Sequence, residues 1–222
     1  ATRPPRKIPD QSLRRVVDGW QPGFKPSLEW TPPLPAREFR PEIEFNWAGC
    51  QARRNGTVLH WLLEEVGRTG IENLTTEQRQ SLNDRIPALL RMLGTGKANN
   101  EAVAEEIHRT FNQTLDSDTG RWVLNNLHRD TACELPIAHG IDGEQINAII
   151  DRTFIDETDT RWIIDYKSGY HAGGDLTAFL RNEADRYRDQ LKRYRQLFEQ
   201  MGEQTIRTAL YLPRHDALQE VR

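Results

Sequence analysis

Residues 149–167 read Ile-Ile-Asp-Arg-Thr-Phe-Ile, then Asp-Glu-Thr-Asp-Thr, then Arg-Trp-Ile-Ile-Asp-Tyr-Lys. The first and last runs are rich in β-branched and aromatic residues, which favour strands, and the polar segment between them is typical of a hairpin turn. If the hairpin is centred on Thr158, Asp151 and Asp165 are equidistant from the turn and face each other across the ladder. Lys167 lies two residues beyond Asp165 and therefore points from the same face of the strand.

Two opposed carboxylates in an apolar hairpin need a compensating cation or a shared proton, because they repel each other and lose hydration. Their Cβ atoms would lie about 4.5–5.5 Å apart. Oxygen ligands of this kind suit Mg²⁺ or Mn²⁺. An ammonium beside the ion, from Lys167, would hold a water molecule and offset the charge that develops on a phosphate under attack. The hairpin therefore predicts metal-assisted phosphodiester cleavage.

A simpler interpretation of the same residues remains open. Asp165 and Lys167 would form an ordinary ion pair at a strand end, and Asp151 would pair with Arg152 or Arg161. In this interpretation the domain is structural and binds no divalent ion.

The pattern around the hairpin predicts an α+β fold, in which a helical N-terminal half packs on a mixed β-sheet. Apolar residues recur at helical spacing over residues 52–126 and predict helices at about 52–67, from a capping box at Thr75 and Gln78 to just before Gly94, and at about 100–115. A short fourth helix is predicted to hold Trp122, Val123 and Leu127. Strands are predicted at 131–138, 145–155 and 161–167, followed by a long helix at 176–201 and a final strand near 205–212.

The first 45 residues differ in composition from the rest of the chain. They contain nine of the twelve prolines and show no apolar periodicity, so they are interpreted as a Pro-rich arm or linker, with the domain over residues 46–222. The chain opens on Ala1 rather than on Met, and we expect it to be cut from a longer polypeptide.

The composition limits the classes of function that the chain can have. Its 222 residues (25.7 kDa) suffice for one domain and a short appendage, and its mean hydropathy of −0.75, without an apolar run near the roughly 20 residues of a membrane helix, excludes a membrane protein. Two cysteines and no charged-then-apolar leader indicate a reducing, cytoplasmic location. The net charge of −3 gives no bulk attraction to duplex DNA.

The strings Ile-Ile-Asp-Arg and Ile-Ile-Asp-Tyr-Lys resemble the metal-binding hairpin of the restriction-endonuclease-like, or PD-(D/E)XK, nucleases. They are most similar to the RecB-type exonuclease domain at the C-terminus of many superfamily 1 helicases. Two further motifs support the resemblance: a Gly-x-x-x-His motif at Gly56 and His60, and a Gln-x-x-x-Tyr motif at Gln190 and Tyr194. The resemblance extends from about Phe45 to the C-terminus.

The resemblance implies a role for each residue that matches a family motif. His60, Asp151 and Asp165 would bind Mg²⁺ or Mn²⁺ together with the backbone carbonyl of Tyr166, and Lys167 would be catalytic beside the two aspartates. The remaining candidates are Gln190 and Tyr194, which would orient the DNA strand, and, as a secondary metal candidate, Glu134. Tyr194 also falls on the apolar stripe of its helix, so its ring would serve the core as well.

The resemblance also implies an activity and partners. The expected activity is a Mg²⁺- or Mn²⁺-dependent deoxyribonuclease, exonucleolytic on single strands, in end processing during DNA repair or recombination. The chain has no Gly-x-x-x-x-Gly-Lys-Ser/Thr loop for ATP, so a helicase motor would lie upstream in the same polypeptide or in a partner subunit. Two cysteines cannot supply the four thiolates of the iron–sulfur cluster that some relatives hold. The alternative is a catalytically inactive, nuclease-like domain that grips DNA or docks a partner subunit.

Overall fold

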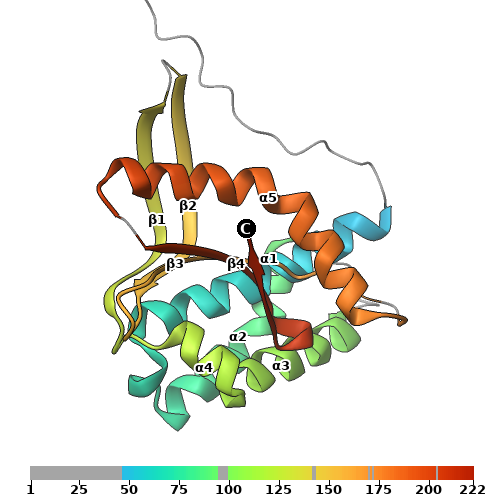
Figure 1. Ribbon diagram of the computed structural model, residues 1–222. Helices are drawn as coiled ribbons and strands as arrows, with labels where there is room; N and C mark the ends of the chain where they lie inside the picture. Colours follow the sequence, from blue (N-terminus) through green and yellow to red (C-terminus); the bar gives the residue numbers. More distant parts are fainter. Residues whose placement is uncertain (1–46, 95–99, 142–143, 170, 172, 204) are drawn as a thin grey trace, which may run out of the picture. The chain divides into compact units, whose positions relative to one another are not determined.

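The computed structural model describes residues 47–94, 100–141, 144–169, 171, 173–203 and 205–222 (Figure 1). The chain divides into two units, Ala1–Pro35 and Ala36–Arg222, and every described residue belongs to the second. The Pro-rich arm over residues 1–45 lies outside the described residues, so its boundary with the domain stays a prediction.

In the described residues four α-helices precede the sheet: α1 (Trp47–Thr69), α2 (Thr76–Met92), α3 (Asn100–Asp116) and α4 (Asp118–Leu124), with a 3-10 helix, η1 (Ile71–Asn73), between the first two. The capping box before α2 is confirmed, since the Thr75 hydroxyl accepts from the Gln78 N–H and the Gln78 side chain accepts from the Thr75 N–H. The prediction that the fourth helix holds Leu127 is wrong. Helix α4 ends at Leu124, where the backbone of Asn125 turns extended, and the Leu127 side chain is exposed.

The sheet contains five strands in the order β1 (Arg129–Ile141), β2 (Glu144–Ile155), β3 (Arg161–Tyr166), β4 (Ile206–Leu212) and β5 (Ala217–Val221). Strands β3 and β4 are parallel and are joined by the long helix α5 (Leu176–Gln200), whereas the other neighbours are antiparallel. The α+β class and the mixed sheet are therefore as predicted. Strand β5 is not predicted from the sequence; it follows a single 3-10 turn, η3 (Pro213–His215).

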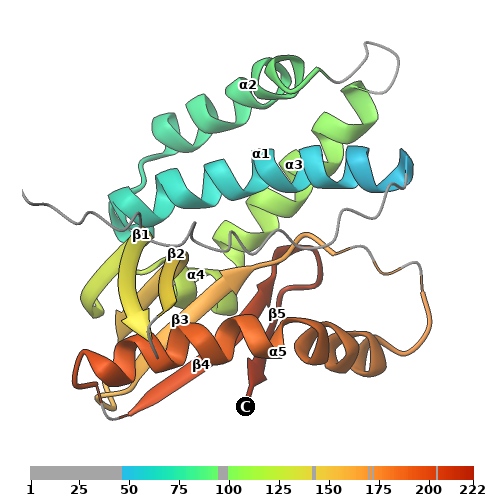
Figure 2. The ribbon, with the colours of Figure 1, turned by 90° about the horizontal axis from the view of Figure 1, so that it is seen from above.

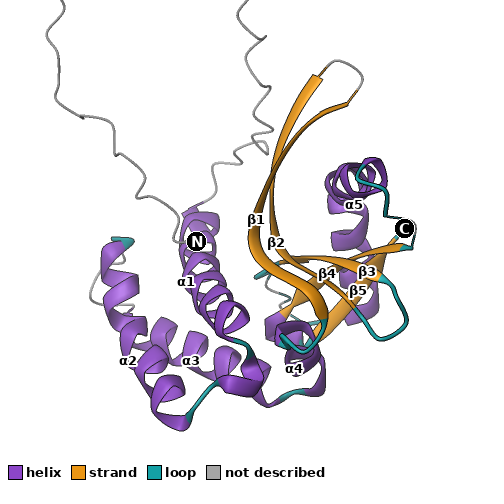
Figure 3. Cartoon of the chain, turned by 90° about the vertical axis from the view of Figure 1, so that its left-hand side faces the viewer, coloured by secondary structure: helices purple, strands orange, loops and turns teal. Residues whose placement is uncertain are grey.

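Helices α1, α2 and α3 lie on one side of the sheet and α5 lies on the other (Figure 2). The side chains of β3 alternate between these two layers: Trp162, Ile164 and Tyr166 belong to the core shared with the N-terminal helices, whereas Ile163 belongs to a core under α5. By the same alternation Asp165 leaves the strand on the α5 face. Strands β1 and β2 form a long, curved hairpin (Figure 3).

None of the described helices is both long enough and apolar enough to span a lipid bilayer.

Candidate active site

Helix α1 presents His60 to the sheet. The helix buries an apolar face made of Val58, Leu59, Leu62, Leu63 and Val66. The His60 ring packs edge-on against Tyr166, with 5.4 Å between ring centroids. The close approach of α1 to the end of β3 depends on Gly56, because a Cβ atom there would lie 2.2 Å from Ser168 Oγ and 3.0 Å from Ser168 Cβ. This glycine explains the first half of the Gly-x-x-x-His motif.

His60 bridges two carboxylates. Its Nε2 lies 3.1 Å from Asp151 Oδ2 and its Nδ1 lies 3.3 Å from Glu134 Oε1. Burial lowers the pKa of His60, but the hydrogen bond to Asp151 and the charges of Asp151, Glu134 and Asp165 outweigh it, so the pKa is raised above its ordinary value. Burial, with the nearby charge of Asp151, raises the pKa of Glu134 despite the opposing effect of His60.

A coupled bend in β1 and β2 brings Glu134 and Asp151 to this position. Cys133 pairs with Arg152 and lies on the side of the N-terminal helices, whereas Leu135 pairs with Ile150 and belongs to the core under α5. Both strands thus change face within two residues, and Glu134 takes a left-handed backbone with φ of 48°. The residues at the bend, Glu134 and Asp151, both contact His60.

Arg152 anchors the bend from the neighbouring position. Its side chain is fully buried, and it donates hydrogen bonds to the carbonyl oxygens of Gly67 at the end of α1 and of Val123 and Asn125 at the end of α4. It also donates to two other neutral acceptors, the Asn126 side-chain oxygen and the Cys133 thiol, whose pKa is raised by burial. The charge is therefore dispersed over helix-terminal carbonyls, which carry partial negative charge.

The hairpin has the register that its sequence predicts. Arg152 pairs with Ile164 and Ile155 with Arg161, so the pairing is symmetric about Thr158. Asp151 lies one residue beyond the Arg152–Ile164 pair, at the end of the ladder. Its Oδ2 accepts a hydrogen bond of 2.7 Å from the Tyr166 N–H. Asp165 is 4% exposed, and burial together with the charge of Asp151 raises its pKa to about 6 despite Lys167. The two aspartates therefore interact across the hairpin, as the sequence predicts.

Lys167 is held against Asp165. Its Nζ lies 2.6 Å from Asp165 Oδ2 and 4.2 Å from the centroid of the Tyr187 ring on α5. Burial lowers the pKa of Lys167, but the charge of Asp165 and their hydrogen bond outweigh it, so the pKa is raised. The side chain is therefore an ammonium at neutral pH, a hydrogen-bond donor and not a base.

Helix α5 supplies the other side of the site. Gln190 Nε2 donates to Asp165 Oδ1 at 3.1 Å and to the Tyr194 hydroxyl at 2.7 Å. The Tyr194 ring also packs against the cores under α5. Its ring therefore lies in the core while its hydroxyl lies at the site, as the apolar stripe of the helix and the family motif together predict. The structure thus brings the two halves of the Gln-x-x-x-Tyr motif to the buried aspartate, four residues apart on one helix face.

The family model of the PD-(D/E)XK nuclease superfamily matches residues 42–220. This chain belongs to the PD-(D/E)XK nuclease superfamily. A search of curated proteins found no match. Membership implies phosphodiester hydrolysis of a nucleic acid with the help of divalent metal ions.

The side chains at the site fit the divalent ion that PD-(D/E)XK nucleases use. Two carboxylate oxygens, Glu134 Oε1 and Asp165 Oδ2, are buried without a hydrogen bond of good geometry, although each has a cationic or imidazole nitrogen nearby. Buried carboxylate oxygens whose hydrogen bonds have poor geometry are costly in the metal-free protein, and a divalent cation would stabilise them. Carboxylates and one imidazole are ligands suited to such an ion.

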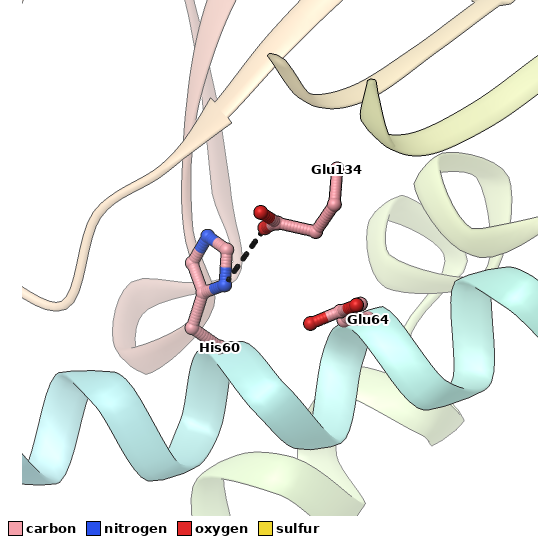
Figure 4. Close-up of side chains that lie close together, drawn as sticks. All are labelled: His60, Glu64 and Glu134. Atoms are coloured by element: carbon pink, nitrogen blue, oxygen red, sulfur yellow. Dashed lines mark ion pairs between the residues drawn. The ribbon is translucent and has the colours of Figure 1, made fainter. Parts of the chain in front are cut away.

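One acidic residue of this site, Glu64, is not predicted from the sequence. His60, Glu64 and Glu134 can each offer a ligand atom within 4.8 Å of the others, and Figure 4 shows His60 and Glu64 side by side on α1, facing Glu134. Glu64 also pairs with Arg68 at 2.6 Å. A signal was present in the sequence, because a residue four positions after a histidine lies on the same helix face.

The ion-pair alternative for Asp151 is wrong among the described residues. Arg152 binds the neutral acceptors named above, and Arg161 pairs with Asp130 and with Glu203. The other half of that alternative, the contact between Lys167 and Asp165, is present. It coexists with the interaction of Asp165 with Asp151 and does not replace it.

Proposed function

We propose that this chain is a Mg²⁺- or Mn²⁺-dependent deoxyribonuclease in which His60, Asp151 and Asp165 hold the ion, together with the Tyr166 carbonyl. The observation that supports the proposal most is the grouping of four side chains: His60 contacts Asp151, the charge of Asp151 acts on the buried Asp165, and Asp165 pairs with Lys167. Glu134 contacts His60 and is the additional candidate ligand. An Mg²⁺ or Mn²⁺ ion supplies Lewis acidity at the phosphate when it is bound.

Each side chain has a role that follows from its charge. Hydrolysis forms a bond from phosphorus to a water oxygen and breaks the bond to the leaving oxygen of the nucleotide, while the water loses a proton to solvent and the leaving oxygen takes one up from solvent. The Lys167 ammonium donates hydrogen bonds to the negatively charged oxygens and to the attacking water, because its raised pKa keeps it protonated. Gln190 holds Asp165 and Tyr194 in place and, with Tyr194, orients the strand.

The remaining parts of the proposal come from the motifs that resemble RecB-type domains. The substrate is single-stranded DNA, cut exonucleolytically and delivered by a helicase motor upstream in the polypeptide or in a partner subunit. The setting is end processing in DNA repair or recombination in the cytoplasm. A negatively charged domain agrees with such delivery, because a motor removes the need to capture DNA by bulk positive charge.

The test is cleavage of labelled single- and double-stranded DNA with Mn²⁺ or Mg²⁺ by the wild-type chain, Asp165→Ala and Lys167→Ala. We expect both variants to lose cleavage while circular dichroism shows an intact fold. Lys192→Ala, which removes an exposed lysine of α5, is the matched control and should cut like the wild type. Cleavage that persists in Asp165→Ala would overturn the assignment. Metal-independent DNA binding without any cleavage by the wild type would favour the inactive, DNA-gripping alternative.

A further inference from the structure

A cavity of about 350 Å³ lies beside the proposed metal site, between α1 and the end of β3. His60 and Lys167 form part of its wall. The rest of the wall contains apolar side chains, among them Leu63 and Pro213, and the hydroxyl residues Thr57 and Ser168. Asp151 and Asp165 do not line it, so the cavity adjoins the site and is distinct from the carboxylates.

Trp61 lines the cavity and has no role in the proposed hydrolysis. It follows His60 directly on α1, and its side chain is 37% exposed although the next two residues, Leu62 and Leu63, are buried. A large aromatic ring with an accessible surface, next to a proposed metal ligand, offers a π-face to a flat partner. Trp61 also lines a smaller hollow between α1 and α2, with Leu82 and Leu89.

We propose that this cavity binds the base of the nucleotide at the scissile phosphate, with the base stacked on Trp61. The inference rests on the proposed nuclease function and specifies the substrate of the same site. The phosphate would lie at the groups that the site and the cavity share, His60 and Lys167. Since only a sugar separates a base from its own phosphate, a phosphate held there brings its base to the cavity.

The size and lining of the cavity favour one unpaired base. Ligand pockets begin at about 300 Å³, so a cavity of about 350 Å³ takes a single base and not a base pair. Stacking on an aromatic ring tolerates every base, because each has a π-face. A base within a duplex is paired and stacked, and it enters only after extrusion at a cost. The pocket therefore selects single strands or frayed ends without reading their sequence.

The test combines a protein variant with a substrate variant. Binding of single-stranded oligonucleotides is measured in EDTA for the wild type, Trp61→Ala and Trp61→Tyr, each with intact DNA and with a series that carries one abasic nucleotide at successive positions. We expect Trp61→Ala to weaken binding of intact DNA about tenfold, equivalent to about 1.4 kcal/mol, and Trp61→Tyr to bind like the wild type. An abasic nucleotide at one position should cause the same loss in the wild type and no further loss in Trp61→Ala.

The same variants give a kinetic readout in Mn²⁺. Trp61→Ala should raise KM for single strands and lower its preference over duplex DNA, with kcat changed far less than by Lys167→Ala. Leu127→Ala removes another exposed apolar side chain and is the matched control, expected to bind and cut like the wild type. If Trp61→Ala fails to fold, the abasic series on the wild-type protein still decides the matter.

Two results would overturn the inference. The first is equal binding of intact DNA by Trp61→Ala and the wild type. The second is additivity, in which an abasic nucleotide weakens binding by Trp61→Ala as much as it weakens binding by the wild type. Failure of the proposed function is recognised separately, as a wild-type chain that does not cut DNA with any divalent ion. The binding cycle in EDTA requires no cleavage, so it reports on the base pocket alone.

Discussion

The two sides of the candidate site, one on α5 and one on α1, are held together by different forces. On the α5 side, Asp165 is almost fully buried and is fixed by Gln190 and Lys167. On the α1 side, His60 lies between Glu134 and Asp151 with its side chain 27% exposed, so that side is held by titratable groups. The α5 side is therefore fixed by burial, by the Gln190 hydrogen bond and by the Lys167 ion pair, whereas the α1 side depends on a partly exposed histidine between two carboxylates and responds to pH and to cations.

Asp151 is the residue that joins the two sides. One of its oxygens contacts both His60 on α1 and the Tyr166 N–H on β3, and its charge contributes to the raised pKa of Asp165. On the α1 side a divalent ion would replace the proton of His60 as the positive charge beside Asp151 and Glu134, so we expect that side to respond more strongly to the ion.

The largest effect is expected from Asp151→Asn, which breaks the link between the sides. The amide oxygen still accepts from the Tyr166 N–H, so the fold survives, but the charge is lost. We expect cleavage to fall by roughly 10³-fold and the rise of Tm with Mn²⁺ to disappear, since a ligand stabilises the folded state only if it binds there. Thermal unfolding across a Mn²⁺ titration checks this.

Asp185→Asn is the control for that variant, because Asp185 is an exposed acid on α5. It should keep the wild-type response to Mn²⁺. A full rise of Tm in Asp151→Asn would contradict the proposed role of Asp151.

A smaller effect is expected from Gly56→Ala, which changes the spacing between the sides. The new methyl group would overlap Ser168 Oγ and push α1, and with it His60, away from β3. We expect about a tenfold loss of cleavage and about 1–2 kcal/mol lower stability, as for other overpacked sites. The double variant Gly56→Ala with Ser168→Gly should recover much of both losses, measured by cleavage rate and urea unfolding. Losses that are equal with and without the Ser168 side chain would show that the contact is not the cause.

The smallest effect is a pH dependence of the metal-free protein. The pKa values of His60, Glu134 and Asp165 are all raised in the folded state, so the stability that each contributes is present at low pH and is lost as the pH rises through the folded pKa. We expect unfolding in EDTA to require on the order of 1–2 kcal/mol more at pH 5.5 than at pH 7.5. With Mn²⁺ the trend should reverse, because ligands must lose their protons to bind metal.

Other titrating groups either change protonation outside the range from pH 5.5 to pH 7.5 or oppose the rise in stability at low pH. The lowered pKa values of Asp116 and Asp156 contribute stability that is lost only as the pH falls toward about 4 and below. His215 opposes the trend, since burial lowers its pKa. In the variant His215→Asn, the free energy of unfolding should therefore increase more between pH 7.5 and pH 5.5 than in the wild type. A Tm in EDTA that falls steadily from pH 7.5 to pH 5.5 in this variant would contradict the prediction.

The parts of the site that follow from local periodicity were predictable from the sequence. The spacing of Asp151 and Asp165 about Thr158 gives the hairpin register, and Lys167 follows from strand alternation. The α5 face that carries Gln190 and Tyr194 follows from helical spacing in the same way. These features depend on one element, or on two elements joined by a short turn.

The rest depends on long-range packing that no local pattern reports. The bend at Glu134 requires a left-handed backbone at a residue other than glycine, which regular alternation does not anticipate. The alternative interpretation considered Arg152 or Arg161 as the ion-pair partner of Asp151, but the acceptors of Arg152 lie at the ends of helices that are distant in sequence. Strand β5 was missed because its five residues pack only against β4 within the sheet.

The burial of Arg152 limits how freely the hairpin could be transplanted into another protein. Residues 149–167 carry most of the proposed chemistry, yet the guanidinium between them and the helices draws on carbonyls at Gly67, Val123 and Asn125. A graft onto a foreign sheet would carry a charged side chain into a core without acceptors, at a cost of several kcal/mol. A working chimaera would have to include the ends of α1 and α4. The hairpin would therefore have to be transferred together with the whole helical layer.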